Sequence, residues 1–252
     1  MICSKSQQRY KRELQGLFTH KKSLLIMVMA SFLISVNWLT YIYAVSHGQA
    51  TQASLGYYIM PLVSILLSVV ILRESLSRWM LLAILVAGLG VGLLIINTGQ
   101  IPLISVTLAF SFGIYGLLKK NVVLSSDVAM LVESGLILPF ALIYLLFFAK
   151  ESMLDYSLFE NGLLVISGII TAFPLLLFAE ALKRAPLNII GFIQYINPTI
   201  QLLIALLIFH EQLVGGELVG FVFIWLAIGV FVTGQVLQIG QSRKRNFRER
   251  IR

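Results

Sequence analysis

Charged side chains are scarce in this sequence. They make up 12% of its 252 residues, while 58% of the residues are hydrophobic. A typical soluble domain is about 25% charged, so too few polar side chains remain here to cover a surface that faces water. This deficit excludes an ordinary soluble enzyme and predicts a protein that lies in a lipid bilayer.

Cysteine and metal-ligand clusters are missing as well. Cys3 is the only cysteine, which excludes a disulfide framework and a cysteine-based metal site. The three histidines lie at polar edges without metal-ligand spacing: His20, His47 and His210. An intramembrane enzyme would need a paired aspartate, a Ser/His set or a metal cluster at membrane depth, and the sequence offers none, so we expect a protein that is not an enzyme.

Glycine-rich nucleotide loops are absent too. The run 88–92 reads Gly-Leu-Gly-Val-Gly, but it lies inside an apolar segment with no strand before it. We therefore expect no cofactor there, and we interpret Gly88 and Gly92 as a GxxxG face for close helix packing.

Long apolar runs dominate what the sequence does contain. About 20 helical residues cross a hydrocarbon core of roughly 30 Å, and neither open strands nor bare loops can face lipid. Eight runs of suitable length predict an all-α membrane protein with eight transmembrane helices. The predicted helices cover residues 24–45, 53–72, 79–98, 101–118, 128–148, 161–182, 188–209 and 217–239.

Lysine and arginine fall on one side of this arrangement. Of the 19 basic residues, every one except Lys150 lies before the first helix, after the last one, or in alternate joins between them. Cytoplasmic loops carry this excess, so both termini are predicted in the cytoplasm of a multi-pass protein of the bacterial inner membrane. The first apolar run exceeds the 7–15 residues or so of a signal peptide, so we expect it to be retained.

An internal repeat emerges when the sequence is shifted by 137 residues. Residues 58–61 then align with residues 195–198 as Tyr-Ile-Met-Pro on Tyr-Ile-Asn-Pro, and Glu74 aligns with Glu211. Five predicted crossings separate the copies, so they have opposite orientations, as in many secondary transporters. The predicted parts are a cytoplasmic basic segment, a first repeat with three helices, a second repeat with five, and a basic cytoplasmic tail, at residues 1–22, 23–98, 101–239 and 240–252. The repeat thus predicts a ten-helix design without its first two helices.

Polar side chains form a stripe in each repeat. Gln194, Asn197, Pro198 and Gln201 recur at helical spacing on 188–209, and the shift places Tyr57, Pro61 and Ser64 opposite members of that set. We interpret the stripes as walls of one substrate cavity, with helix–helix hydrogen bonding as the alternative. Further candidates for this cavity are Asn37, Trp38, Tyr58 and Tyr195.

Glu133 and Glu180 are acidic residues within predicted spans. Glu133 lies about a turn and a half inside 128–148, where an acid costs roughly 2.5–3.5 kcal/mol and is usually functional. It could bind a cation or carry a proton, or it could reach back to the cytoplasmic surface. For Glu180, an ion pair with Lys183 or Arg184 at the helix end is the preferred interpretation.

A resemblance to a known family rests on three stretches. They are Asn37-Trp38-Leu39-Thr40-Tyr41-Ile42, Ala53-Ser54-Leu55-Gly56-Tyr57-Tyr58 and Gly191-Phe192-Ile193-Gln194-Tyr195-Ile196-Asn197-Pro198-Thr199-Ile200-Gln201. They resemble the RarD-like branch of the EamA transporters, in the drug/metabolite transporter superfamily, over roughly residues 23–239. The resemblance implies ten helices in two inverted repeats and a permease, often described as a chloramphenicol-sensitivity protein.

The leading functional hypothesis is a permease that moves a small organic metabolite or drug by alternating access, with export as the expected direction. Without a nucleotide-binding motif, its energy would come from an ion gradient or from exchange. The alternatives are a non-transporting remnant or membrane interaction protein, and an intramembrane enzyme. The expected partners are a small-molecule substrate and the lipid bilayer, without nucleic acid, and the sequence leaves a homodimer open.

Overall fold

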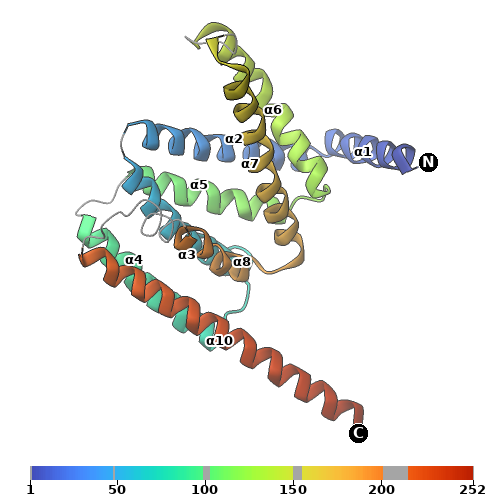
Figure 1. Ribbon diagram of the computed structural model, residues 1–252. Helices are drawn as coiled ribbons and strands as arrows, with labels where there is room; N and C mark the ends of the chain where they lie inside the picture. Colours follow the sequence, from blue (N-terminus) through green and yellow to red (C-terminus); the bar gives the residue numbers. More distant parts are fainter. Residues whose placement is uncertain (1, 48, 99–102, 150–154, 201–214, 252) are drawn as a thin grey trace. The chain divides into compact units, whose positions relative to one another are not determined.

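The computed structural model describes residues 2–47, 49–98, 103–149, 155–200 and 215–251, and these ranges are helical without any strand (Figure 1). The helices are α1 Ile2–Thr19, α2 Lys21–Ser46, α3 Ala50–Val70, α4 Arg78–Thr98, α5 Leu103–Lys120, α6 Ser126–Phe147, α7 Leu158–Arg184, α8 Leu187–Ile193 and α10 Gly215–Ile251. The all-α prediction is confirmed for the described residues.

Seven of the described helices are long and apolar enough to cross a membrane. They lie where seven of the eight spans were predicted. The remaining predicted span, 188–209, begins as α8, but its residues 201–209 lie outside the described part of the chain. The count of eight therefore stays a prediction.

The sequence predicts one continuous helix over 188–209, but the described part of this segment, 188–200, contains a break. The α-helix ends at Ile193, a turn occupies 194–195, and helix resumes at 196. Pro198 explains the break, because proline has no N–H to donate to the Gln194 carbonyl and its ring clashes with that carbonyl in a regular helix. The backbone N–H of Asn197 bonds to the Gln194 oxygen instead, at 3.1 Å. The first-repeat counterpart, Pro61, lies inside an unbroken α3.

The chain divides into two compact units. Unit 1 comprises Met1–Trp38 and Ile114–Ala185, and unit 2 comprises Leu39–Gly113 and Pro186–Arg252. Each unit is described below by itself.

In unit 2, α4 and α10 pack against each other over most of the length of α4 (Figure 1). A Cβ added at Gly90 would lie 2.8 Å from the Gly220 carbonyl oxygen, and one at Gly234 would lie 2.3 Å from the Cβ of Trp79. Because the contact positions rise along one helix as they fall along the other, the two helices are antiparallel. Only glycine permits this approach of two backbones.

The predicted GxxxG face is wrong. A Cβ at Gly88 or Gly92 would meet no atom within 4 Å among the described residues, whereas Gly90 makes the close contact. Because α4 is apolar on every side, the sequence period did not reveal which side packs. The face that packs lies about half a turn away from the predicted one, because Gly90 is two residues from Gly88 and two from Gly92.

Helix α3 packs between elements of both repeats in unit 2. Gly56 lies against Ser105 and Leu108 of α5, and Gly113 lies against Val63 of α3. These contacts rise together along both helices, so α3 and α5 are parallel. The shared apolar core of the unit combines residues of α3, α4 and α10 with Phe192 and Tyr195.

In unit 1, the basic N-terminal segment folds as a helix rather than as an irregular loop. Leu17 of α1 is 1% exposed and packs with Met27, Leu124, Val128 and Ala129. A search for long apolar runs does not reveal α1, because this helix buries a narrow apolar side while its other residues are polar.

Candidate functional site

The crossing of α3 and α8 brings the two proline motifs of unit 2 together. A Cβ at Gly191 would lie 2.8 Å from Ile65 and 3.2 Å from the Pro61 carbonyl oxygen. Close by, the Tyr58 hydroxyl donates to the Pro198 carbonyl oxygen at 3.1 Å. That carbonyl belongs to the segment after the helix break, so Tyr58 joins the first repeat to the irregular part of the second.

Two side chains beside this crossing have buried polar atoms without a hydrogen-bond partner in the described part of the chain. Both amide atoms of Gln194 lack a hydrogen-bond partner among the described residues. The Tyr195 hydroxyl lacks one as well, although Tyr195 is 0% exposed. Leaving such groups unsatisfied costs about 1–3 kcal/mol each. Groups of this kind are candidates for contacts with a bound molecule.

The other predicted cavity residues of unit 2 are placed as follows. Ser64 is 1% exposed, and Pro61 is buried at the α3–α8 crossing. Tyr57 is half-buried, and its ring meets Tyr41 edge to face at a centroid distance of 5.8 Å. Asn197 is exposed, so it does not share the burial of Gln194 that a straight stripe implied. Gln201 lies outside the described residues.

Three predicted residues belong to unit 1. Asn37 is buried on α2, and the neighbouring Trp38 is 40% exposed. Glu133 of α6 is buried in contact with Lys119 and Tyr115 of α5. Of these three, Glu133 is the one whose side chain forms an ion pair within the described part of unit 1.

Glu133 takes part in a buried ion pair. Lys119 Nζ lies 3.0 Å from Oε1, and the Tyr115 hydroxyl donates to Oε2 at 3.2 Å. The Lys119 and Glu133 side chains are only 2% and 8% exposed, so the acid does not reach back to the surface. In the sequence, Lys119 is recognisable only as one of the basic residues that predict the topology. Its spacing of four residues from Tyr115, which puts both on one face of α5, was the available signal.

Glu74 was known from the sequence only as a repeat position. Its two carboxylate oxygens accept from the backbone N–H groups of Leu187 and Asn188, at 2.9 and 3.0 Å. A carboxylate at the first N–H groups of a helix satisfies donors that have no partner within the helix. Glu74 therefore fixes the start of α8 and has a structural role. Its repeat mate Glu211 lies outside the described residues.

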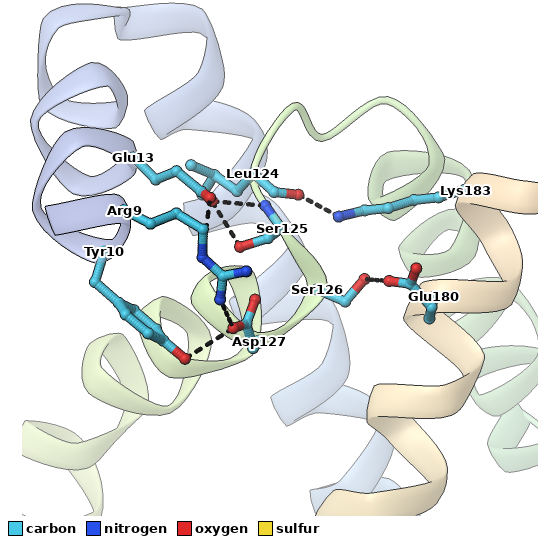
Figure 2. Close-up of polar contacts among 9 residues, drawn as sticks. All are labelled: Arg9, Tyr10, Glu13, Leu124, Ser125, Ser126, Asp127, Glu180 and Lys183. Carbon is cyan, nitrogen blue, oxygen red and sulfur yellow. Dashed lines mark hydrogen bonds and ion pairs between the residues drawn. The ribbon is translucent and has the colours of Figure 1, made fainter. Parts of the chain in front are cut away.

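Glu180 forms the predicted ion pair at its helix end. Arg184 Nη2 lies 2.6 Å from Glu180 Oε1, and the other oxygen accepts from Ser126 at 2.7 Å. Lys183, the alternative partner, instead donates to the Leu124 carbonyl (Figure 2). These contacts fasten the end of α7 to the start of α6.

Helix α1 holds the other side of the same loop (Figure 2). Glu13 accepts from the backbone N–H and the hydroxyl of Ser125, both at 2.7 Å. Arg9 pairs with Asp127, and the Tyr10 hydroxyl donates to the same carboxylate at 2.7 Å. That bond raises the pKa of Tyr10, because a phenolate would face a carboxylate. The segment once expected only to set topology is thus bound to the α5–α6 loop.

No group of acidic, histidine and cysteine side chains that could hold a metal occurs among the described residues. A groove of about 540 Å³ lies between α4 and α10, and its lining is mainly apolar: Trp79, Val222, Trp225, Leu226, Gly229, Val230 and Thr233. None of the predicted cavity residues lines it.

Comparisons with known proteins place these features in a family. The model of the EamA-like transporter family matches residues 7–96 and 101–233. The chain is 46% identical over 217 residues to the uncharacterized transporter YojE of Bacillus subtilis, covering 84% of this chain and 72% of that protein. It is 38% identical over 222 residues to protein RarD of Escherichia coli K12, covering 87% and 75%.

A solved crystal structure of a protein has the same fold. Its TM-score is 0.63 at 15% sequence identity, over 88% of this chain and 83% of that one, which supports the fold alone. The identification rests on the family model, which matches two segments of the chain, and on the similar relatives. The apolar helices agree with it. The chain belongs to the EamA-like transporter family, on its RarD-like branch, and is a multi-pass membrane transporter of the drug/metabolite superfamily.

Proposed function

We propose that this chain is a permease that moves a small organic metabolite or drug out of the cell across the bacterial inner membrane, by alternating access, with both termini in the cytoplasm. The family supplies the class of function. The sequence has no nucleotide-binding motif, so an ion gradient or exchange would supply the energy.

The observation that carries the proposal is the buried Gln194 amide beside the α3–α8 crossing. Both of its polar atoms lack a partner among the described residues, and the helix is broken at that position. Interrupted membrane helices commonly form the substrate sites of secondary transporters. A bound organic molecule with hydrogen-bonding groups would satisfy the amide and the Tyr195 hydroxyl together.

An asymmetry between repeat mates supports alternating access. Tyr58 and Tyr195 are equivalent under the repeat, as are Pro61 and Pro198. Tyr58 donates to Pro198, while the Tyr195 hydroxyl has no partner within the described residues. Inverted repeats that alternate would exchange their conformations. In the opposite state Tyr195 would therefore donate to Pro61, and Tyr58 would be released.

Cysteine accessibility tests the proposal. In a chain without Cys3, the variants Tyr57→Cys and Gln194→Cys should both react with a small polar thiol reagent in membrane vesicles. The reagent requires a thiolate, and a thiolate requires water. The matched controls are Ile65→Cys and Ile190→Cys, whose native residues are 1% and 5% exposed; they should stay inert.

The pattern of reaction decides the outcome. Reaction at both test positions with inert controls supports one water-filled pathway. Reaction of Gln194→Cys alone would restrict the pathway to the second repeat. If neither test position reacts, the polar groups are packing contacts and the permease proposal fails.

A further inference from the structure

The Lys119–Glu133 pair differs from the other charged contacts of unit 1. Its side chains are 2% and 8% exposed, whereas those of Arg9–Asp127 are 50% and 34% exposed, and those of Arg184–Glu180 are 76% and 40% exposed. Glu133 lies seven residues beyond Ser126, the start of α6, which is about 10 Å along the helix. Of these three ion pairs, Lys119–Glu133 is thus the most deeply buried.

Helix packing alone does not account for a lysine at this position. Lys120 donates to the Ala185 carbonyl at 2.8 Å and Lys183 donates to the Leu124 carbonyl, so these two lysines bind the end of α7 and the α5–α6 loop. Lys119 instead places its ammonium against a carboxylate. Removing both charges from water is costly, and apolar residues of similar volume often stabilise a fold equally well. Ionisable residues inside a membrane protein more often serve a solute or ion pathway.

We propose that Lys119 is an anion-binding residue for a carboxylate-bearing organic solute, and that Glu133 occupies it while no solute is bound. The inference deepens the proposed permease function and rests on it. The ammonium is a compact point charge on a flexible stem, so it can turn from one carboxylate to another without moving α5. The Tyr115 hydroxyl, 3.2 Å from Glu133, can stay with Glu133 during the exchange.

Charge balance sets a condition on this exchange. The empty pair is neutral, and a solute carboxylate would add one negative charge to a buried site. Glu133 restores neutrality by taking up one proton when the solute carboxylate replaces it on Lys119. The ionisable groups near the pair are Tyr115 on α5 and, more distantly, Lys183 on α7. Asp127 on α6 is engaged with Arg9 of α1.

Charged thiol reagents test the site without knowledge of the solute. In a chain without Cys3, Glu133→Cys places a thiol beside Lys119. A methanethiosulfonate reagent with a sulfonate group should modify this thiol faster than one with an ammonium group. The ratio of the two rates should fall by roughly fivefold or more when Lys119→Met is added, as expected for the loss of a unit charge about 4 Å away even in bulk water. The ratio cancels any change in the fraction of thiolate.

A matched control separates this site from a general surface effect. Glu180→Cys lies at an exposed ion pair on α7, and Lys119→Met should leave its reagent ratio unchanged. If Glu133→Cys folds poorly, the double variant Lys119→Met/Glu133→Leu decides. Normal folding with loss of the flux of carboxylate-bearing solutes supports the site. Normal folding with an unchanged flux of these solutes overturns it. The proposal is also overturned if Glu133→Cys does not react, or if the ratio of the two reaction rates is unchanged by Lys119→Met. If Gln194→Cys still reacts in that case, the permease proposal stands.

Discussion

Tyr58 and Tyr195 show how much one hydroxyl group can report about a transporter. Both rings are buried in the apolar core of unit 2, and both sit three residues before a proline. They differ in their hydroxyl groups. The Tyr58 hydroxyl donates to the Pro198 carbonyl, whereas the Tyr195 hydroxyl has no partner among the described residues. If this difference marks one of two states, the tyrosines should have opposite effects on the balance between them.

Phenylalanine substitutions test this at the same scale. Tyr58→Phe should destabilise the state described here, and Tyr195→Phe should destabilise the opposite one. Combined separately with Gln194→Cys, they should shift its reaction rate in opposite directions. Each shift should be roughly threefold, because a membrane helix–helix hydrogen bond contributes about 0.6 kcal/mol. Shifts in the same direction would show that the two hydroxyls are only packing groups.

At the scale of elements, the antiparallel pair α4–α10 depends on a few glycine contacts. Gly90 and Gly220 let the backbones meet, and a Cβ at Gly220 would lie 2.6 Å from Leu94. Since α4 and α10 are repeat mates by the 137-residue shift, this contact also joins the two copies. The same is true of α3 and α8, which cross at Pro61 and Gly191.

Alanine substitutions along α4 should separate the packed side from the open one. Gly90→Ala should lower the stability of the protein by about 1–3 kcal/mol, as expected for overpacking. Gly88→Ala should be neutral or slightly stabilising, because its added methyl group meets open space and alanine favours helix by about 0.5–1 kcal/mol. Thermal unfolding in one detergent compares the two. Equal losses would contradict this difference, because they would mean that the Gly88 side of α4 is packed as closely as the Gly90 side.

For the whole molecule, the alternating distribution of lysine and arginine predicts the topology. Cysteines at Gln49 and Tyr156, both in joins predicted to lie outside, should react with an impermeant reagent added to intact cells. Cysteines at Ser75 and Asn121 should react only after the membrane is opened. All four replace residues of short loops in a chain that lacks Cys3. Labelling of Asn121→Cys in intact cells would contradict the predicted orientation.

How well the sequence predicted the structure depended on the kind of signal. The spans were predictable because about 20 apolar residues are needed wherever a helix crosses lipid; the run at 24–45 became α2 Lys21–Ser46. The site was less predictable. Lys119 looked like a surface charge because a sequence period cannot show that α6 covers it. Gln194 and Tyr195 were predicted as cavity residues from their polar groups, but the break that Pro198 causes decides which of their neighbours are buried with them.

The burial of Lys119 has a consequence for the order of events during biosynthesis. Positive charges near a span influence its orientation while the chain is being inserted, and acidic residues contribute little at that stage. Lys119 would then act as a free charge, since its partner Glu133 follows 14 residues later on the next helix. Once α5 and α6 pack, the same ammonium is neutralised and withdrawn from the surface. One residue would thus serve first to orient the nascent chain and afterwards, in the proposed site, to hold the solute.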